Sequence, residues 1–136
     1  MKDFSEELIE EGMEYARNLH SLAYAPYSKF HVSAALYLSE KKEFIGGVNV
    51  ENMSFGGTIC AERSAICSAV SKYGKTAFGF IIIYTRHKTL TPPCGICRQF
   101  ISEFCDGDFP VILINHMNKR RDMMFSELLP HPFESF

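Results

Sequence analysis

The sequence predicts an α/β fold, a three-layer αβα sandwich in which helices cover both faces of a mixed, mostly parallel five-stranded sheet. Two apolar runs, FGFIIIYT at 78–85 and PVILIN at 110–115, are typical of strands buried on both faces. Segments with the spacing of amphipathic helices alternate with these runs, which favours strands joined by crossover helices. The 136 residues are enough for one hydrophobic core, so we expect a single domain over residues 1–136.

The first third of the chain predicts a helix and then a hairpin. Asp3 or Ser5 can cap a helix that continues to about Leu19, because apolar side chains recur there at helical spacing. Alternating apolar residues at 31–38 predict a strand, and EFIGGVNV at 43–50 is its expected antiparallel partner.

The rest of the chain completes a βαβαβ pattern. A helix is expected from Cys60 to about Tyr73, where Gly74 ends it. A second helix is expected over 96–104, between the two buried strands.

Charge and composition exclude several classes of function. The net charge is -2, and the one dense basic run, at 119–121, is interpreted as a solvated turn, so we expect no nucleic-acid partner. No apolar run approaches the roughly 18 residues that span a bilayer, and the acidic, helix-like start is unlike a signal peptide. We therefore expect a cytoplasmic protein without a membrane partner, whose five cysteines serve metal or thiol chemistry rather than disulfides.

Three of these cysteines fit a catalytic zinc site. Zinc binds thiolates in tetrahedral geometry, and a catalytic ion keeps its fourth position for water. Cys94 and Cys97 have the two-residue gap that lets both sulfurs face one ion, and Cys60 is the expected third ligand. Cys60 and Cys94 also stand at predicted helix starts, where the positive end of the helix dipole stabilises a thiolate. We expect one Zn²⁺ per chain.

Glu62 and Arg63 are the candidate partners of this site. A carboxylate two residues after Cys60, at the helix entry, can take a proton from a metal-activated water and return it to a substrate. Three thiolates leave a zinc site negatively charged, and the guanidinium of Arg63 can donate hydrogen bonds to the sulfurs. An ordinary surface position for Arg63 is the alternative.

A closed structural zinc site would need a fourth sulfur, from Cys67 or Cys105. Cys67 is expected about 10 Å along the same helix as Cys60, and Cys105 at the far end of the next helix. Both are therefore expected to be small core residues. None of the histidines has a spacing that matches the cysteines, and all are expected to be structural or exposed: His20, His31, His87, His116 and His131.

Taken together, these motifs resemble the cytidine deaminase family in its compact form with three cysteine ligands. The resemblance rests on YAPYSKF at 24–30, GVNVENMSFGGTICAERSA at 47–65, PCGICRQ at 93–99 and ELLPHPF at 127–133. These motifs stand in family order and extend over most of the chain.

The resemblance implies a zinc-dependent hydrolase that deaminates free cytidine and 2′-deoxycytidine to uridine and 2′-deoxyuridine, releasing ammonia, as in pyrimidine salvage. It implies that Cys60, Cys94 and Cys97 bind the zinc and that Glu62 is the proton shuttle.

The resemblance also implies a set of substrate contacts: Phe30, Asn49, Val50, Glu51 and Ala61. Asn49 and Glu51 would bind the ribose hydroxyls, Phe30 would pack against the base, and the backbone around Ala61 would help to hold the pyrimidine. The residues alone indicate that the side chains of Asn49 and Glu51 point the same way, because they alternate on an extended segment. Without the resemblance, such a polar pair is often exposed to solvent and has no ligand.

A homotetramer is the oligomer that the resemblance implies, with the aromatic ring of Phe133 reaching into a neighbouring subunit's site. The chain departs from the family pattern at Ser33, at Phe55 and at His131-Pro132. These departures touch the packing near the pocket and the cross-subunit contact, and they leave the metal set intact.

Three rival functions stay open. A related deaminase could act on a cytosine-containing antibiotic such as blasticidin S, although the Asn49 and Glu51 pair favours a ribose. A nucleic-acid deaminase would need a basic groove and more stacking aromatics. A non-catalytic zinc module would make Glu62 incidental.

Overall fold

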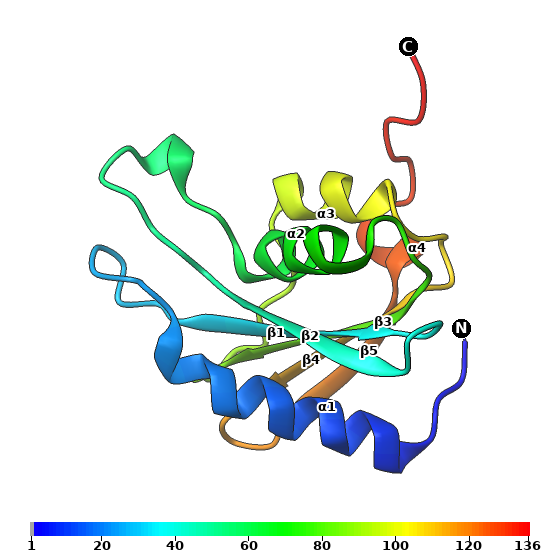
Figure 1. Cartoon of the computed structure of the whole chain (residues 1–136). Coiled ribbons are helices and arrows are strands. Elements are labelled where there is room, and N and C mark those ends of the chain that lie inside the picture. Colours follow the sequence, from blue (N-terminus) through cyan, green and yellow to red (C-terminus); the bar gives the residue numbers. More distant parts are fainter. Residues whose placement is uncertain (1) are drawn as a thin grey trace.

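The computed structural model describes residues 2–136, and its five strands form one sheet in the order β2-β1-β3-β4-β5. Helix α1 lies on one face of this sheet, and α2 and α3 lie on the other (Figure 1). The predicted α/β sandwich with a mixed five-stranded sheet is therefore confirmed.

The strand directions correct one part of the prediction. Strand β1 (Val32–Leu38) pairs antiparallel with β2 (Glu43–Val48) and with β3 (Phe78–Thr85). Strand β4 (Pro110–Asn115) runs parallel to β3 and antiparallel to β5 (Arg120–Met124). The expectation of a mostly parallel sheet is wrong, since β3 and β4 form its one parallel pair within residues 2–136.

The path of the chain explains these directions. The connection from β2 through α2 crosses over β1, so that β3 has the direction of β2 but lies beside β1. Because β1 and β2 form a hairpin, β1 must then be antiparallel to both neighbours. Within the described residues 2–136, only the β3-α3-β4 unit joins adjacent strands through a helix.

The three long helices match their predicted positions within a few residues. Helix α1 (Glu6–Leu19) begins where the Ser5 hydroxyl accepts a hydrogen bond from the Leu8 amide at 3.2 Å, and α2 (Ala61–Tyr73) ends at Gly74, which has a positive φ of 70°. Helix α3 (Gly95–Ser102) lies between β3 and β4. The sequence did not indicate the short helix α4 (Phe125–Leu128) or the 3-10 turns η1 (His20–Leu22) and η2 (Phe55–Gly57).

Two hydrophobic layers hold the sandwich together. Every residue of β3 and β4 is buried, as their continuous apolar runs predicted. On one face Ile82 packs in the cluster that includes Met13 of α1, and on the other Ile81 packs with Ile66 of α2 and Ile101 of α3. The sheet therefore positions α2 and α3 side by side above the same face (Figure 1).

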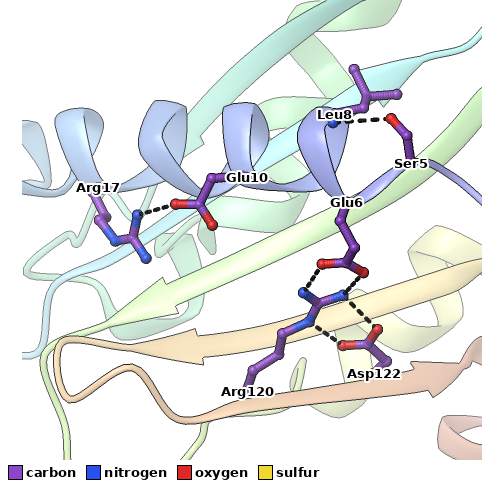
Figure 2. A network of polar contacts seen from close by, with 7 residues as sticks. All are labelled: Ser5, Glu6, Leu8, Glu10, Arg17, Arg120 and Asp122. Carbon is purple, nitrogen blue, oxygen red and sulfur yellow. Dashed lines mark hydrogen bonds and ion pairs between the residues drawn. The ribbon is translucent and has the colours of Figure 1, made fainter.

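Residues 119–121 were expected to form a solvated turn, but two of them, Arg120 and Arg121, begin the edge strand β5. Arg120 donates hydrogen bonds to the carboxylate of Glu6 at 2.8 and 3.2 Å and to that of Asp122 at 2.7 and 2.8 Å. Figure 2 shows this guanidinium between the two carboxylates, joining the first turn of α1 to β5.

The segments that contain the sequence motifs meet at one end of the sheet, the end at which β3 terminates. Val32, the first residue of β1, pairs with Thr85, the last residue of β3. The loop before β1 and the loop that leads from β3 into α3 therefore lie at the same end of the sheet. Within residues 2–136, the helices are all too short or too polar to span a bilayer.

Candidate metal centre

Three thiol groups from two helix starts meet in one cluster. Cys60 is the N-cap of α2, Cys94 is the N-cap of α3, and Cys97 is the third residue of α3. Their sulfurs all lie within 4.8 Å of one another, and the Sγ atoms of Cys60 and Cys94 are 3.7 Å apart. Ligands about 2.3 Å from zinc at tetrahedral angles stand about 3.8 Å apart, so this donor set fits a zinc ion.

The backbone at both helix starts leaves the sulfurs available as ligands. Cys60 and Cys94 are both extended, with φ and ψ of -74° and 159° and of -67° and 170°. Neither side chain caps its own helix. The first amide groups of α2 and α3 contribute a positive potential at this point, which favours thiolates.

The surroundings of Cys60 favour its thiolate form. A hydrogen bond from the Cys97 thiol, together with the Arg63 guanidinium, lowers the pKa of Cys60 to about 5. The same sulfur-sulfur bond and burial raise the pKa of Cys97. Arg63 Nη2 lies 3.7 Å from Cys60 Sγ and donates to the Thr58 carbonyl at 3.1 Å, so this guanidinium is fixed beside the cluster and is not an ordinary surface group.

Glu62 brings a buried carboxyl group to the three sulfurs. It is the second residue of α2, its side chain is almost inaccessible at 4% exposure, and it forms no ion pair within the described residues 2–136. Burial, and after it the negative charge of Cys60, raises the pKa of Glu62 to about 7. Both protonation states are then accessible near neutral pH, which suits proton transfer.

A close contact with the sheet fixes the entry of α2. Gly47 in β2 lies against the first turn of the helix, where a Cβ atom would collide with the Ala61 carbonyl oxygen and the Ala65 amide nitrogen. Ala61 itself is fully buried. The absence of a side chain at Gly47 thus lets Cys60 and Glu62 approach the strand.

Asn49 and Glu51 both bond to the segment that leads into β1. Asn49 accepts a hydrogen bond from the Val32 amide at 2.9 Å and donates to the Phe30 carbonyl at 2.8 Å. Glu51 accepts from the Tyr27 and Ser28 amides at 3.0 Å each and from the Ser28 hydroxyl. These bonds, that of the Ser28 hydroxyl first, lower the pKa of Glu51 and keep it ionised. The two side chains therefore face one side, as their alternation predicted.

The structure separates the side chain of Val50 from this pair. Val50 pairs through its backbone with Ile59, at 2.9 and 3.0 Å, and is 44% exposed. Its side chain lines a surface cavity over α2 together with Ile59 and Cys67. Because neighbouring residues of an extended segment point in opposite directions, only the backbone of Val50 lies between Asn49 and Glu51.

Phe30 and Phe133 occupy different environments. Phe30 is partly buried against the core, and its ring meets that of His87 edge to face, with 5.7 Å between the centroids. Phe133 is 63% exposed, and both backbone polar groups of this residue bond to the side-chain amide of Gln99. The C-terminal residues extend away from the body of the protein (Figure 1).

The two remaining cysteines stay outside the cluster, but only one of them matches its predicted environment. Cys67 is exposed on α2, which contradicts a core position, since it lies on the helix face turned away from the sheet. Cys105 is partly buried and donates to the Ile101 carbonyl, and burial raises the pKa of its thiol to about 12.

Sequence reasoning missed Arg98, which follows Cys97 and donates at 2.8 Å to the carbonyls of Pro93 and Leu128. Its place in PCGICRQ gave no sign of these contacts.

Comparison with known proteins gives a consistent result. Residues 6–113 match the family model of the cytidine and deoxycytidylate deaminase zinc-binding region. The cytidine deaminase of Sporosarcina psychrophila is 40% identical over 125 residues, which are 92% of this chain and 90% of that protein. A crystal structure of cytidine deaminase from Burkholderia pseudomallei superposes with a TM-score of 0.86 at 35% identity, covering 91% of this chain and 98% of that one. The blasticidin-S deaminase of Bacillus cereus is more distant, at 34% identity over 112 residues and 76% of each chain.

Proposed function

The chain belongs to the cytidine and deoxycytidylate deaminase family, and from this premise we propose that it is a zinc-dependent enzyme that hydrolyses cytidine to uridine and ammonia. The observation that carries the proposal is the buried carboxyl group of Glu62 beside three sulfurs spaced for one zinc ion. We extend the proposal to 2′-deoxycytidine, to a role in pyrimidine salvage in the cytoplasm, and to one catalytic domain over residues 1–136.

Cys60, Cys94 and Cys97 would hold the zinc, with Arg63 offsetting the negative charge of their sulfurs. A zinc ion held by these sulfurs would lower the pKa of a bound water molecule toward roughly 7, and that water would be the nucleophile for C4 of the pyrimidine. The hydrogen bond that Arg63 makes to the Cys60 sulfur holds that ligand in place without occupying the position of a fourth ligand.

Glu62 would move the protons of the reaction. Its carboxylate accepts one proton from the attacking water and delivers it to N3 of the ring. It then accepts the second proton of that water from the new hydroxyl group on C4 and passes it to the departing amine. One water molecule is consumed, the C4–N bond breaks, a carbonyl replaces the amine, and ammonia leaves. A pKa of about 7 lets Glu62 act as base and then as acid near neutral pH.

The nucleoside would lie between the helix entry at Ala61 and the segment before β1. We assign Asn49 and Glu51 to the ribose hydroxyls, because Glu51 is ionised and Asn49 keeps a second donor hydrogen after its bond to Phe30. Phe30 would pack against the base. Val50 would contribute through its backbone alone.

We propose a homotetramer in which Phe133 reaches the site of a neighbouring subunit. The exposure of its ring and the two hydrogen bonds that Gln99 makes to its backbone support this assignment. The backbone of Phe133 is thus fixed to α3, and its exposed ring is available for contact with another subunit.

The test is ammonia release by the zinc-loaded protein from cytidine, 2′-deoxycytidine, cytosine, adenosine, blasticidin S and single-stranded DNA. We expect turnover of the two nucleosides and little from the other four. Preferential turnover of blasticidin S or of DNA would replace the proposed substrate. Inactivity of the zinc-loaded protein toward the whole panel would point to a non-catalytic zinc module.

A further inference from the structure

A basic pocket lies beside the candidate nucleoside site. Its volume is about 360 Å³, and it is lined by His20, Lys29, Phe30, His31, Arg86 and His87. Five of these six residues carry or can acquire a positive charge, and no carboxylate lines the pocket. The residues come from the end of α1, the loop before β1 and the loop after β3, which meet at one end of the sheet.

The two full positive charges of the basic pocket, those of Lys29 and Arg86, are not paired with carboxylates among the described residues. The protein as a whole has a net charge of -2, so this concentration of cations is a local feature. Arg17, Lys72 and Arg120, by contrast, are paired with carboxylates.

The cationic groups of the pocket also repel one another. Burial lowers the pKa of His20, and the nearby positive charges of His31 and Arg86 lower it further. The rings of His20 and His31 lie with their centroids 5.6 Å apart. Like charges held this close are unfavourable, and an anion bound among them would relieve the repulsion.

The pocket shares residues and contacts with the nucleoside site. Phe30 lines the pocket, and its carbonyl accepts the hydrogen bond from Asn49. Lys29 directly follows Ser28, which binds Glu51, and the charge of His31 contributes to the lowered pKa of Glu51. A group in the basic pocket would thus lie next to the residues assigned to the base and the ribose.

Lys29 adopts a backbone conformation that is uncommon for lysine. Its φ is 62°, in the left-handed region, which costs a non-glycine residue about 1 kcal/mol. The Lys29 amide donates to the Ala25 carbonyl at 3.0 Å, and the Phe30 amide donates to the Ser28 hydroxyl at 3.0 Å. The loop therefore fixes the backbone of Lys29 at the rim of the pocket.

We propose that the basic pocket binds a phosphate group beside the nucleoside site, with Arg86 and Lys29 as charged anchors and the histidines as further donors. Guanidinium groups bind phosphate oxygens in a bidentate manner, and an ammonium group adds a second full charge. The ligand is either free phosphate or the phosphate of a pyrimidine nucleotide whose ring occupies the nucleoside site. The nucleotide form rests on the proposed function, whereas the phosphate site itself does not.

The first test measures the binding of inorganic phosphate to the zinc-loaded protein by calorimetry at constant ionic strength. We expect Arg86→Gln and Lys29→Asn each to weaken binding about tenfold or more, since each removes a charged hydrogen-bond donor. Asparagine tolerates the left-handed backbone at position 29. Arg121→Gln removes the same charge from an exposed position on β5 and should leave binding unchanged.

The second test separates the two sources of phosphate by comparing uridine with uridine 5′-monophosphate as inhibitors of cytidine turnover. Tighter inhibition by the nucleotide, lost in Arg86→Gln, would mean that a nucleotide spans both sites. Phosphate binding without any advantage for the nucleotide would identify a separate anion site. Cytidine turnover is measured in every variant, so that a general loss of activity is recognised.

The proposal is overturned if neither phosphate nor the nucleotide binds, or if binding is unaffected by both Arg86→Gln and Lys29→Asn. Calorimetry requires no turnover, which keeps this outcome distinct from failure of the proposed function. If the protein binds phosphate through Arg86 but releases no ammonia from cytidine, the anion site is supported and the assignment as a deaminase is wrong.

Discussion

The side-chain amide of Gln99 forms two hydrogen bonds with the backbone of Phe133, donating to its carbonyl at 2.9 Å and accepting from its amide at 3.0 Å. Gln99 lies on α3 two residues after Cys97, so the helix that carries two of the candidate metal ligands also holds the C-terminal segment. This contact links the metal centre to the aromatic residue assigned to a neighbouring site.

We predict that Gln99→Ala raises KM for cytidine about three- to tenfold with a smaller change in kcat, because each lost hydrogen bond is worth about 1 kcal/mol at most at an exposed position. Phe133→Ala should have a similar effect. If Gln99 acts through Phe133, the double variant is no worse than the stronger single one. Steady-state kinetics of the three variants, with Glu134→Gln as the control, check this. Additive losses would mean that Gln99 has another role.

The second prediction concerns the buried carboxyl group of Glu62. Glu62→Gln preserves the shape of the side chain and removes its ability to accept and return a proton. We expect zinc content equal to that of the wild type and a rate of deamination lower by about 10² to 10⁴, the usual contribution of general acid–base catalysis. Metal analysis and ammonia release on the same sample check this. Unchanged turnover would remove Glu62 from the mechanism.

The third prediction separates ligand cysteines from the others. Cys97→Ala removes a sulfur of the cluster and should abolish stoichiometric zinc binding, because a three-ligand site cannot lose one ligand without a large loss of affinity. Cys67→Ala and Cys105→Ala remove sulfurs outside the cluster and should retain one zinc per chain. Metal analysis after dialysis against a weak chelator checks this. Zinc loss in either control would indicate a four-sulfur structural site.

The sequence predicted the buried strands well because burial on both faces leaves a continuous apolar run. The prediction at 78–85 and 110–115 coincides with β3 and β4 at both ends. Strand β5 has the sequence RRDMM, with no continuous apolar run, since it is an edge strand whose residues are exposed or only partly buried. The direction of β1 relative to β3 depends on the crossover of the chain above β1, which no local pattern records.

Among the candidate site residues, the three cysteines were predictable because few residue types bind zinc and their spacing at helix starts is restrictive. Contacts between distant segments were not. The bond between Ser28 and Glu51 joins residues 23 positions apart, and the bond between Gln99 and Phe133 joins residues 34 positions apart. His20, assigned a structural or exposed role, lines a pocket with Arg86, which only the fold brings near.

The fourth prediction concerns the contact between Gly47 and α2. Gly47→Ala places a Cβ against the Ala61 carbonyl and the Ala65 amide, and overpacking of this kind costs about 1–3 kcal/mol. We expect a lower free energy of unfolding in urea and weaker zinc retention, because the helix entry that carries Cys60 must move. Gly56→Ala is the matched control, since a Cβ there meets nothing within 4 Å. Equal stability of the two variants would contradict the proposed role of Gly47.

The last prediction concerns the pH dependence of stability at the contact between α1 and β5. The hydrogen bond and the charge of Arg120 lower the pKa of Glu6 below its ordinary value of 4.5 (Figure 2). A carboxyl group with a lowered pKa stabilises the folded state fully above its unfolded pKa, and this contribution is lost as the pH falls through the folded pKa. Glu6→Gln should therefore unfold at a lower urea concentration than the wild type at pH 6, and the difference should shrink below pH 4.5.

Glu7→Gln is the matched control, because it removes the same charge from the same exposed turn of α1, and Glu7 forms no ion pair within residues 2–136. Acid also protonates the cysteine ligands, but this affects all three proteins equally, so only the differences between them are interpreted. Added salt should reduce the Glu6 effect, since the pair is exposed and screened. If the two variants lose the same stability at pH 6, the loss reflects the charge of the helix start, and the pairing with Arg120 contributes nothing measurable.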